Sequence, residues 1–383
     1  SLLLRVRGAH PVVDVGLRQH CQRMDPEVLA HGGGVFGIER PSSSQHLKLR
    51  NEFIKQVFGR YVTDDVVESL LNSPKALELG GQKREVTILM SDLRGFTSLA
   101  ERLTPERVVE VLNIYLGAMA EVIDRYRGVI DEFIGDAVLA LFGAPVVREN
   151  HAERAVACAL AMQLAMDGVN AQLRELNIPP LEMGIGVNTG EVIVGNIGSL
   201  QRAKYGAVGS QVNLASRIQS ATVGREILIS AATARHLQPL LELQREVVFF
   251  AKGMSQPMTL YSVTGLRGAY QLRMPAVAET FSPLACELAV ECFHLNEAKL
   301  VNGAPFAGWL TALSPHGGLL KTAEPLATRS DLKLSIPSAR APDERWDVYA
   351  KVMDAPTAST SFPVRFTSLP PHGWPSCACR RPP

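Results

Sequence analysis

Two aspartates and an Asn–Arg pair are the residues whose types and spacing best suit phosphate chemistry in this sequence. Asp92 follows the apolar run VTILMS, and Asp136 lies within GVIDEFIGDAVLALFG. Asn213 and Arg217 are four residues apart in VNLASR, which would place them on one face of a helix. Carboxylates bind divalent metal ions, and an Asn–Arg pair can steady a sugar and a phosphorus centre. These four side chains therefore predict a site for metal-assisted phosphate chemistry.

The elements that must position these residues alternate between strands and helices. A helix should begin at Thr104-Pro105-Glu106, because a capping hydroxyl, a proline in the first turn and an early acidic residue favour a helix start. The other expected elements are a strand in VTILMSD, a hairpin over 129–142 turning at 135–136, a helix over 149–176, two strands in MGIGVNTGEVIVGNIG, and later strands in EILIS and LYSV.

These strings, in this order, resemble the class III nucleotidyl cyclases, the adenylate and guanylate cyclase family, over about residues 84–265. The resemblance implies an α/β (α+β) domain with a ferredoxin-like, palm-type core. It also implies conversion of ATP to 3′,5′-cyclic AMP and pyrophosphate by attack of the ribose 3′-hydroxyl on the α-phosphate. The cofactors it implies are two divalent ions, Mg²⁺ or Mn²⁺, held by Asp92 and Asp136 with the Leu93 carbonyl.

The family resemblance also assigns roles to the substrate contacts. It implies that Asn213 orients the ribose and that Arg217 stabilises the charge that develops at the α-phosphoryl group. Lys252 matches a late lysine that grips the terminal phosphates, the alternative being a solvated lysine before a turn. Glu191 stands where some relatives carry a phosphate-binding arginine. Backbone N–H groups of the loop after Asp92 can cradle the β- and γ-phosphates at a helix start, and this loop is Leu93, Arg94, Gly95, Phe96 and Thr97.

Two positions bear on the choice of base. Relatives that select adenine carry a Lys where this chain has Glu132, and an Asp or Thr where it has Gly206. A carboxylate accepts the N1–H and 2-amino hydrogens of guanine, whereas adenine N1 requires a donor. Most bacterial-looking members of the family make cyclic AMP, and water or a rotated Glu132 could serve adenine. The expectation is therefore ATP, with GTP as the alternative.

In this family the two halves of one site come from different subunits. Asp92 and Asp136 would lie on one chain, and Glu132, Asn213, Arg217 and Lys252 would reach across from the other. The sequence contains both halves, so the partner it implies is a second copy of the same chain.

Composition restricts the other classes of function. The net charge is +1, and 46% of residues are apolar, which gives no electrostatic signal for nucleic acid. No apolar run reaches the roughly 18 residues that a membrane span requires. The six cysteines are scattered, and Cys377 and Cys379 give only a weak indication of metal binding. From these observations we expect reduced thiols and a cytoplasmic location.

The regions outside residues 84–265 are less informative. Residues 1–43 read as an irregular remnant of an upstream segment. Residues 44–83 read as helical, either coupling two chains or packing on their own domain. Residues 281–368 show short strands typical of a small β-barrel, and residues 369–383 read as disordered.

The predicted barrel weakly resembles PilZ domains, a family that often binds cyclic di-GMP. The paired arginines of that family are not evident, and its Asp or Asn position is Ala312, ahead of Ser314 and Gly317. A degenerate barrel that packs or contacts partners is therefore favoured over a cyclic-dinucleotide receptor.

Two further functions compete with an active cyclase. A catalytically silent nucleotide-sensing module would be favoured by loss of the metal, ribose or transition-state residues, and none is lost. A diguanylate cyclase would need a GG[DE]EF hairpin, whereas this hairpin reads FIGDA.

Overall fold

The computed structural model describes residues 78–199, 201–249, 256–276, 279–296, 300–337, 345–353 and 360–368. The irregular segment expected at residues 1–43, most of the helical segment expected at 44–83, Lys252 and the tail after residue 368 lie outside these residues. Residues 80–83 of that expected helical segment are described, and they belong to a strand instead. All of the described residues belong to one structural unit.

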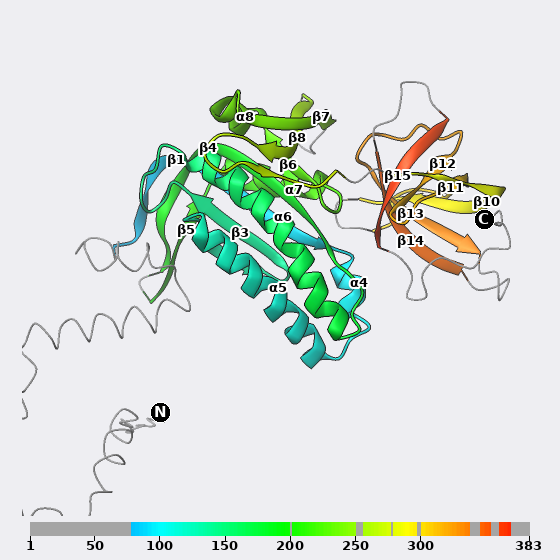
Figure 1. The fold of residues 1–383 in the computed structure, drawn as a ribbon, viewed down its shortest axis with the longest axis horizontal. Helices are drawn as coiled ribbons and strands as arrows, with labels where there is room; N and C mark the ends of the chain where they lie inside the picture. The colour runs from blue at the N-terminus through cyan, green and yellow to red at the C-terminus, as the bar shows by residue number, and fades with distance from the viewer. Residues whose placement is uncertain are drawn as a thin grey trace, which may run out of the picture. The chain divides into compact units, whose positions relative to one another are not determined.

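A long mixed sheet forms the centre of the first half of this unit (Figure 1). Its hydrogen-bonded order is β2-β3-β1-β4-β6-β8-β7, with β5 paired to β4 and β9 to β8. The strands are β1 (Gly80–Arg94), β2 (Val129–Ile134), β3 (Ala137–Phe142), β4 (Glu182–Ser199), β5 (Arg202–Val208), β6 (Ile227–Ser230), β7 (Leu241–Phe249), β8 (Met258–Leu266) and β9 (Leu272–Arg273).

Helices lie on both faces of this sheet. The helices are α4 (Phe96–Ala100), α5 (Pro105–Arg125), α6 (His151–Glu175), α7 (Ser210–Ala221) and α8 (Ala231–Leu237). Alternate residues of β1 enter two different cores, because successive side chains of a strand point to opposite faces. Leu89 packs with α5 and α6, whereas Ile88 packs in the cluster that contains Ala215 of α7. The middle of β1 is therefore covered on both faces, by α5 and α6 on one side and by α7 on the other.

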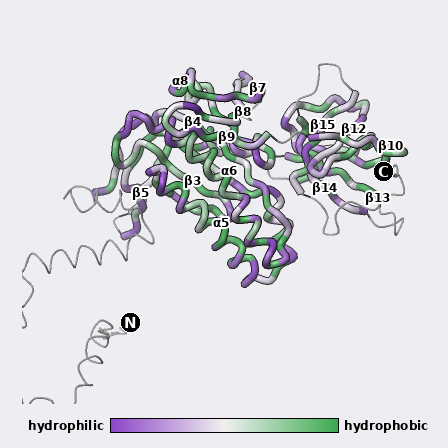
Figure 2. The backbone as a smooth tube through the Cα atoms, in the orientation of Figure 1, coloured by the Kyte–Doolittle hydropathy of each residue, from purple (hydrophilic) through white to green (hydrophobic). Residues whose placement is uncertain are grey.

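The continuous apolar run of β3 follows from this burial. All six residues of β3 are buried, and the tube in Figure 2 is hydrophobic along this strand.

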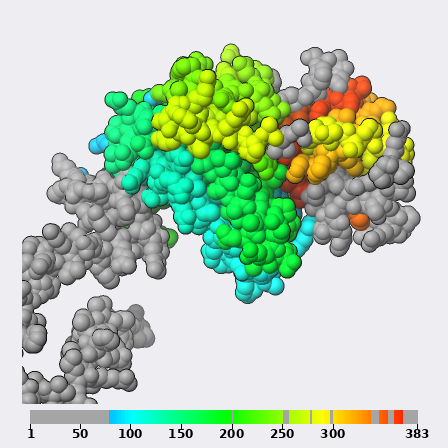
Figure 3. Space-filling view, in the orientation of Figure 1, coloured from blue at the N-terminus to red at the C-terminus, as the bar shows by residue number. Residues whose placement is uncertain are grey.

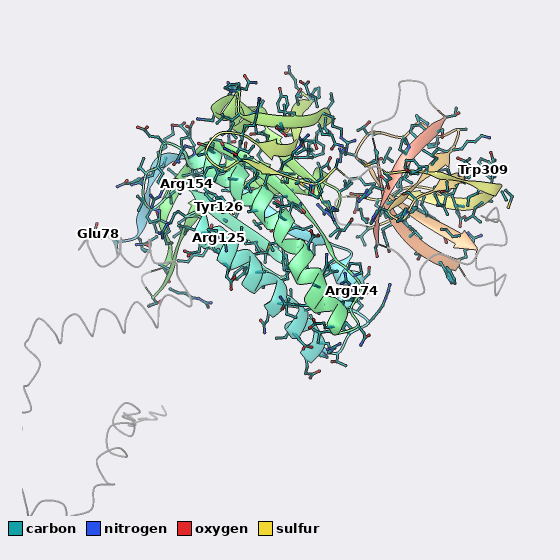
Figure 4. All side chains as sticks on the ribbon, viewed as in Figure 1. Glu78, Arg125, Tyr126, Arg154, Arg174 and Trp309 are labelled. Atoms are coloured by element: carbon teal, nitrogen blue, oxygen red, sulfur yellow. The ribbon has the colours of Figure 1, made fainter. Side chains whose placement is uncertain are left out.

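Helices α5 and α6 adjoin each other on the face visible in Figure 3. Side chains of Arg125, Arg154 and Arg174, labelled in Figure 4, come from the ends of these two helices or from their first turns. The helices thus pair an apolar inner face with charged residues outside.

One predicted element is wrong. We expected two strands in MGIGVNTGEVIVGNIG, but the structure has the single strand β4, Glu182–Ser199. This strand stays paired with β1 from Gly80↔Asn196 to Arg94↔Glu182, so the NTG triplet does not turn. A Cβ at Gly190 would approach the Gln211 side chain within 2.8 Å, which indicates that this glycine serves close packing with α7.

The expected small β-barrel is confirmed. Six strands close in the order β10-β11-β12-β15-β14-β13 around an apolar core. They are β10 (Ser282–His294), β11 (Phe306–Leu313), β12 (Gly317–Lys321), β13 (Asp331–Pro337), β14 (Arg345–Val352) and β15 (Ser361–Ser368). The PilZ resemblance stays a prediction.

One of the described cysteines forms a disulfide bond, contrary to the prediction of reduced thiols. Cys286 in β10 is disulfide-bonded, whereas Cys158 and Cys292 are free and buried. The prediction of reduced thiols throughout is therefore wrong, and the cysteines no longer support a reducing compartment. Sequence spacing could not reveal this bond, because pairing depends on which cysteines the fold brings together.

Among the described helices, none is long and apolar enough to cross a membrane.

A buried ion pair joins residues far apart in this unit. Arg329 donates to both carboxylate oxygens of Glu226, at 2.7 and 2.9 Å, and its side chain is 0% exposed. Arg245 donates to the same carboxylate at 2.9 Å. Burial opposes ionisation of Glu226, but the two arginines outweigh it and lower its pKa. The carboxylate is therefore held in its charged form by both guanidinium groups.

Replacing Arg329 with Met should destabilise the protein by about 2–4 kcal/mol, because the Glu226 carboxylate would stay buried with only the Arg245 guanidinium to balance its charge. Chemical denaturation of the full chain measures this free energy. Arg345→Met is the matched control, since Arg345 forms a 2.6 Å pair with Glu291 but is 52% exposed. It should cost under about 1 kcal/mol. Equal losses in the two variants would contradict a special role for the buried pair.

Candidate active site

The two predicted metal-binding aspartates come together at the ends of neighbouring strands. Asp92 lies near the end of β1, and Asp136 lies in the β2–β3 turn, where Gly135 adopts a φ of 64°. The Leu93 N–H donates to Asp136 Oδ2 at 3.1 Å, which fixes the turn against β1. Strand pairing of β1 with β3 brings the two carboxylates side by side.

The electrostatics of this pair suit a cation. Burial and the negative charge of Asp92 raise the pKa of Asp136 to about 7. Like charges this close resist simultaneous ionisation unless a positive ion offsets them. Oxygen donors of this kind are what Mg²⁺ and Mn²⁺ prefer. The donor set therefore fits the two divalent ions that the family resemblance implies, although no cluster of three or more acidic, His or Cys side chains occurs among the described residues.

The raised pKa predicts a pH-dependent stability in the absence of metal. The folded protein holds the Asp136 proton more tightly than the unfolded chain does, so this stabilisation is complete below pH 3.8 and lost as the pH rises through 7. Asp136→Asn should remove this pH-dependent loss of stability. With a chelator present, the free energy of unfolding of the variant minus that of the wild type should rise by about 1–3 kcal/mol from pH 5 to pH 8, measured by urea denaturation. The same difference in free energy at pH 5 and pH 8 would contradict the raised pKa of Asp136.

The predicted phosphate loop follows Asp92 directly. Gly95 has a φ of 72°, a left-handed conformation that a glycine adopts at little cost. Phe96 is buried and anchors the start of α4, whereas Thr97 is exposed. The Arg94 guanidinium donates to Gln219 O at 2.9 Å and to Thr222 Oγ1. The Arg94 side chain therefore braces β1 against the end of α7, and phosphate binding by the loop backbone stays a prediction.

Asn213 and Arg217 occupy α7 as expected. Both residues are exposed, and their four-residue spacing places them on one face of the helix. Glu191, by contrast, forms a 2.7 Å ion pair with Lys83 on the sheet surface. Lys252 lies outside the described residues.

The predicted base-recognition residues lie where β2 and β5 approach each other. Glu132 is about half exposed and accepts a hydrogen bond from Lys204 Nζ at 2.9 Å. The same ammonium lies 3.3 Å from Asp131 Oδ1. Gly206 is buried beside them. Sequence reasoning identified Glu132 and Gly206 but missed Asp131 and Lys204, because β2 and β5 are separated by more than 60 residues and are not hydrogen-bonded neighbours.

Comparison with known proteins places this geometry in a family. The family described as "Adenylate and Guanylate cyclase catalytic domain" matches residues 80–265. The chain is 32% identical to "Adenylate cyclase 1" of Rhizobium meliloti over 55% of its own length and 32% of that protein. It is 34% identical to "Adenylate cyclase" of Anabaena cylindrica, over 54% of its own length and 42% of that protein. It thus spans less than half of each of these relatives.

A solved structure covers the same domain completely. The crystal structure of the guanylyl cyclase Cya2 is 51% identical, with a TM-score of 0.51, over 51% of this chain and all of that chain. The matched region contains the paired aspartates, the glycine loop and the Asn–Arg helix described above. The chain therefore belongs to the class III adenylate and guanylate cyclase family and carries its catalytic domain at residues 80–265.

Proposed function

We propose that this chain forms 3′,5′-cyclic GMP and pyrophosphate from GTP. The observation that carries the choice of base is Glu132, an exposed carboxylate at the position that contacts the base in the family. It can accept the N1–H and 2-amino hydrogens of guanine. The 51% identity to a guanylyl cyclase supports the same choice.

Conversion of ATP to cyclic AMP, which the sequence favoured, is the second candidate. The curated relatives from Rhizobium meliloti and Anabaena cylindrica are both named adenylate cyclases, at 32% and 34% identity. Against this substrate, a carboxylate beside adenine N1 would place one acceptor against another and leave adenine N1 without a donor, a loss worth about 1–3 kcal/mol.

The chain's own residues would position and neutralise the triphosphate. Asp92 and Asp136, with the Leu93 carbonyl, would hold two divalent ions, which supply activation of the 3′-hydroxyl and charge neutralisation when bound. The backbone from Arg94 to Thr97 would bind the β- and γ-phosphates, because the Leu93 N–H already donates to Asp136. Asn213 would orient the ribose, and Arg217 would stabilise negative charge at the α-phosphoryl group. Lys252 would grip the terminal phosphates.

A homodimer with shared sites is part of the proposal. Large apolar side chains stand exposed on β2 and β5, which carry the base-recognition residues, and on β4, which pairs with β5: Phe133 is 45%, Ile134 51%, Ile193 44% and Val208 55% exposed. Exposed apolar groups gathered in this way mark an interaction surface. A second copy of the chain would cover them while bringing its aspartates to this chain's Asn213 and Arg217.

Product formation tests this function directly. The purified full chain would be supplied with Mn²⁺ and either GTP or ATP, with Asp136→Ala as the control. We expect cyclic GMP to dominate, and dominance of cyclic AMP would favour the second candidate. If neither product exceeds the control in a dimeric sample, the cyclase assignment fails and the catalytically silent nucleotide-sensing module replaces it. A cytoplasmic location and weak or absent cyclic di-GMP binding by the barrel remain predictions.

A further inference from the structure

The buried position Gly206 has no side chain because Asp131 occupies its space. A Cβ built on Gly206 would lie 2.6 Å from Asp131 Oδ1, closer than real contacts allow. The other oxygen, Asp131 Oδ2, accepts a hydrogen bond from the Ala207 N–H at 3.3 Å. A carboxylate from β2 therefore stands where a side chain of β5 would otherwise project.

A β-bulge explains how Asp131 reaches this place. In the pairing of β2 with β3, Ile130 pairs with Ala140 and Glu132 pairs with Leu139, so Asp131 has no partner on β3. Adjacent residues of a regular strand point to opposite faces. An extra residue in a bulge redirects its side chain, so two consecutive acidic residues can serve one side of the sheet.

The position of Lys204 shows that the Asp131 and Glu132 carboxylates lie on the same side of the sheet, because one ammonium group contacts both. Its ammonium lies 2.9 Å from Glu132 Oε2 and 3.3 Å from Asp131 Oδ1. Lys204 and Glu132 are each 51% exposed, so their pair alone would be mobile and weak. The Asp131 side chain is only 2% exposed. It therefore acts as a rigid, charged anchor for an otherwise mobile lysine.

We propose that Asp131 is a positioning residue for purine recognition, holding Lys204 so that Lys204 and Glu132 together read the guanine edge. This inference rests on the proposed function. Lys204 would donate to guanine O6, and Glu132 would accept from N1–H and the 2-amino group. Asp131 thereby fixes Lys204, the donor that completes base recognition where Gly206 has no side chain.

Three single variants of the full chain test this role by the ratio of kcat/KM for GTP to kcat/KM for ATP. Asp131→Asn keeps an oxygen for the Ala207 N–H but removes the charge that holds Lys204. We expect the ratio to fall about 10-fold in Asp131→Asn and in Lys204→Met. Lys321→Met is the matched control, because Lys321 pairs with Glu287 at 3.0 Å and is 52% exposed. It should leave the ratio unchanged.

A double-mutant cycle tests the shared space between Asp131 and Gly206. Gly206→Ala alone should lower the ratio about 10-fold, because the new Cβ displaces the carboxylate. Once Asp131→Ala has emptied the space, adding Gly206→Ala should have little further effect. Additive losses, or a Gly206→Ala variant equal to the wild type, would overturn the inference.

Other outcomes separate this inference from the proposed function. If the wild type prefers ATP, the proposed function fails, and the inference fails with it. If the wild type prefers GTP and Asp131→Asn lowers GTP and ATP turnover equally, only the inference fails, since Asp131 then has a merely structural role. Thermal unfolding of each variant identifies a folding defect, and relative binding of GTP and ATP then replaces turnover as the readout.

Discussion

Chains that carry Asp136→Ala and chains that carry Arg217→Ala should each lose cyclase activity by about a thousandfold or more. The first change removes one of the two neighbouring carboxylates, the one that accepts the hydrogen bond from the Leu93 N–H. The second removes the exposed guanidinium of α7 that would neutralise charge at the α-phosphoryl group. Neither residue belongs to an apolar core cluster, so both variants should fold.

An equal mixture of the two inactive variants should regain about a quarter of the wild-type rate. Half of the dimers would be mixed, and each mixed dimer would have one intact site and one doubly defective site. The measurement is product formation after the two chains have been unfolded together and refolded as a mixture. A mixture as inactive as its components would show that each site is built from a single chain, and the shared-site part of the proposal would fail.

Glu132→Lys should change the preference between bases, lowering the GTP-to-ATP ratio of kcat/KM by about 100-fold. The lysine would offer a donor to adenine N1 and leave guanine N1–H without an acceptor. It would also lose the 2.9 Å pair with Lys204, whose ammonium would face a like charge. The measurement is the rate of cyclic GMP formation from GTP and of cyclic AMP formation from ATP, each with Mn²⁺, from which the ratio of kcat/KM follows.

Glu287→Lys is a suitable control for this substitution. Glu287 resembles Glu132 in being about half exposed and in forming a 3.0 Å pair with a lysine, but it lies in the barrel. It should leave the ratio unaltered. If Glu132→Lys also leaves the ratio unaltered while activity persists, Glu132 is not the base selector, and the choice between GTP and ATP must depend on other residues.

Local sequence alone was sufficient for the parts of the site that lie within single elements. An apolar run ending in Asp92 predicted a strand with a carboxylate at its end, and Gly135-Asp136 predicted the hairpin turn. The spacing of Asn213 and Arg217 predicted one helical face. These features follow from backbone periodicity and turn chemistry, which act over a few residues.

Only the tertiary structure decided which distant residues meet. The bulge at Asp131, its burial against Gly206 and its pairing with Lys204 depend on the register of β2 and on the approach of β5. The single long strand β4 likewise depends on its unbroken pairing with β1. The pairing of Arg329 with Glu226 spans 103 residues. Such contacts form because sheet closure and burial select among many locally acceptable arrangements, a choice that short-range patterns do not contain.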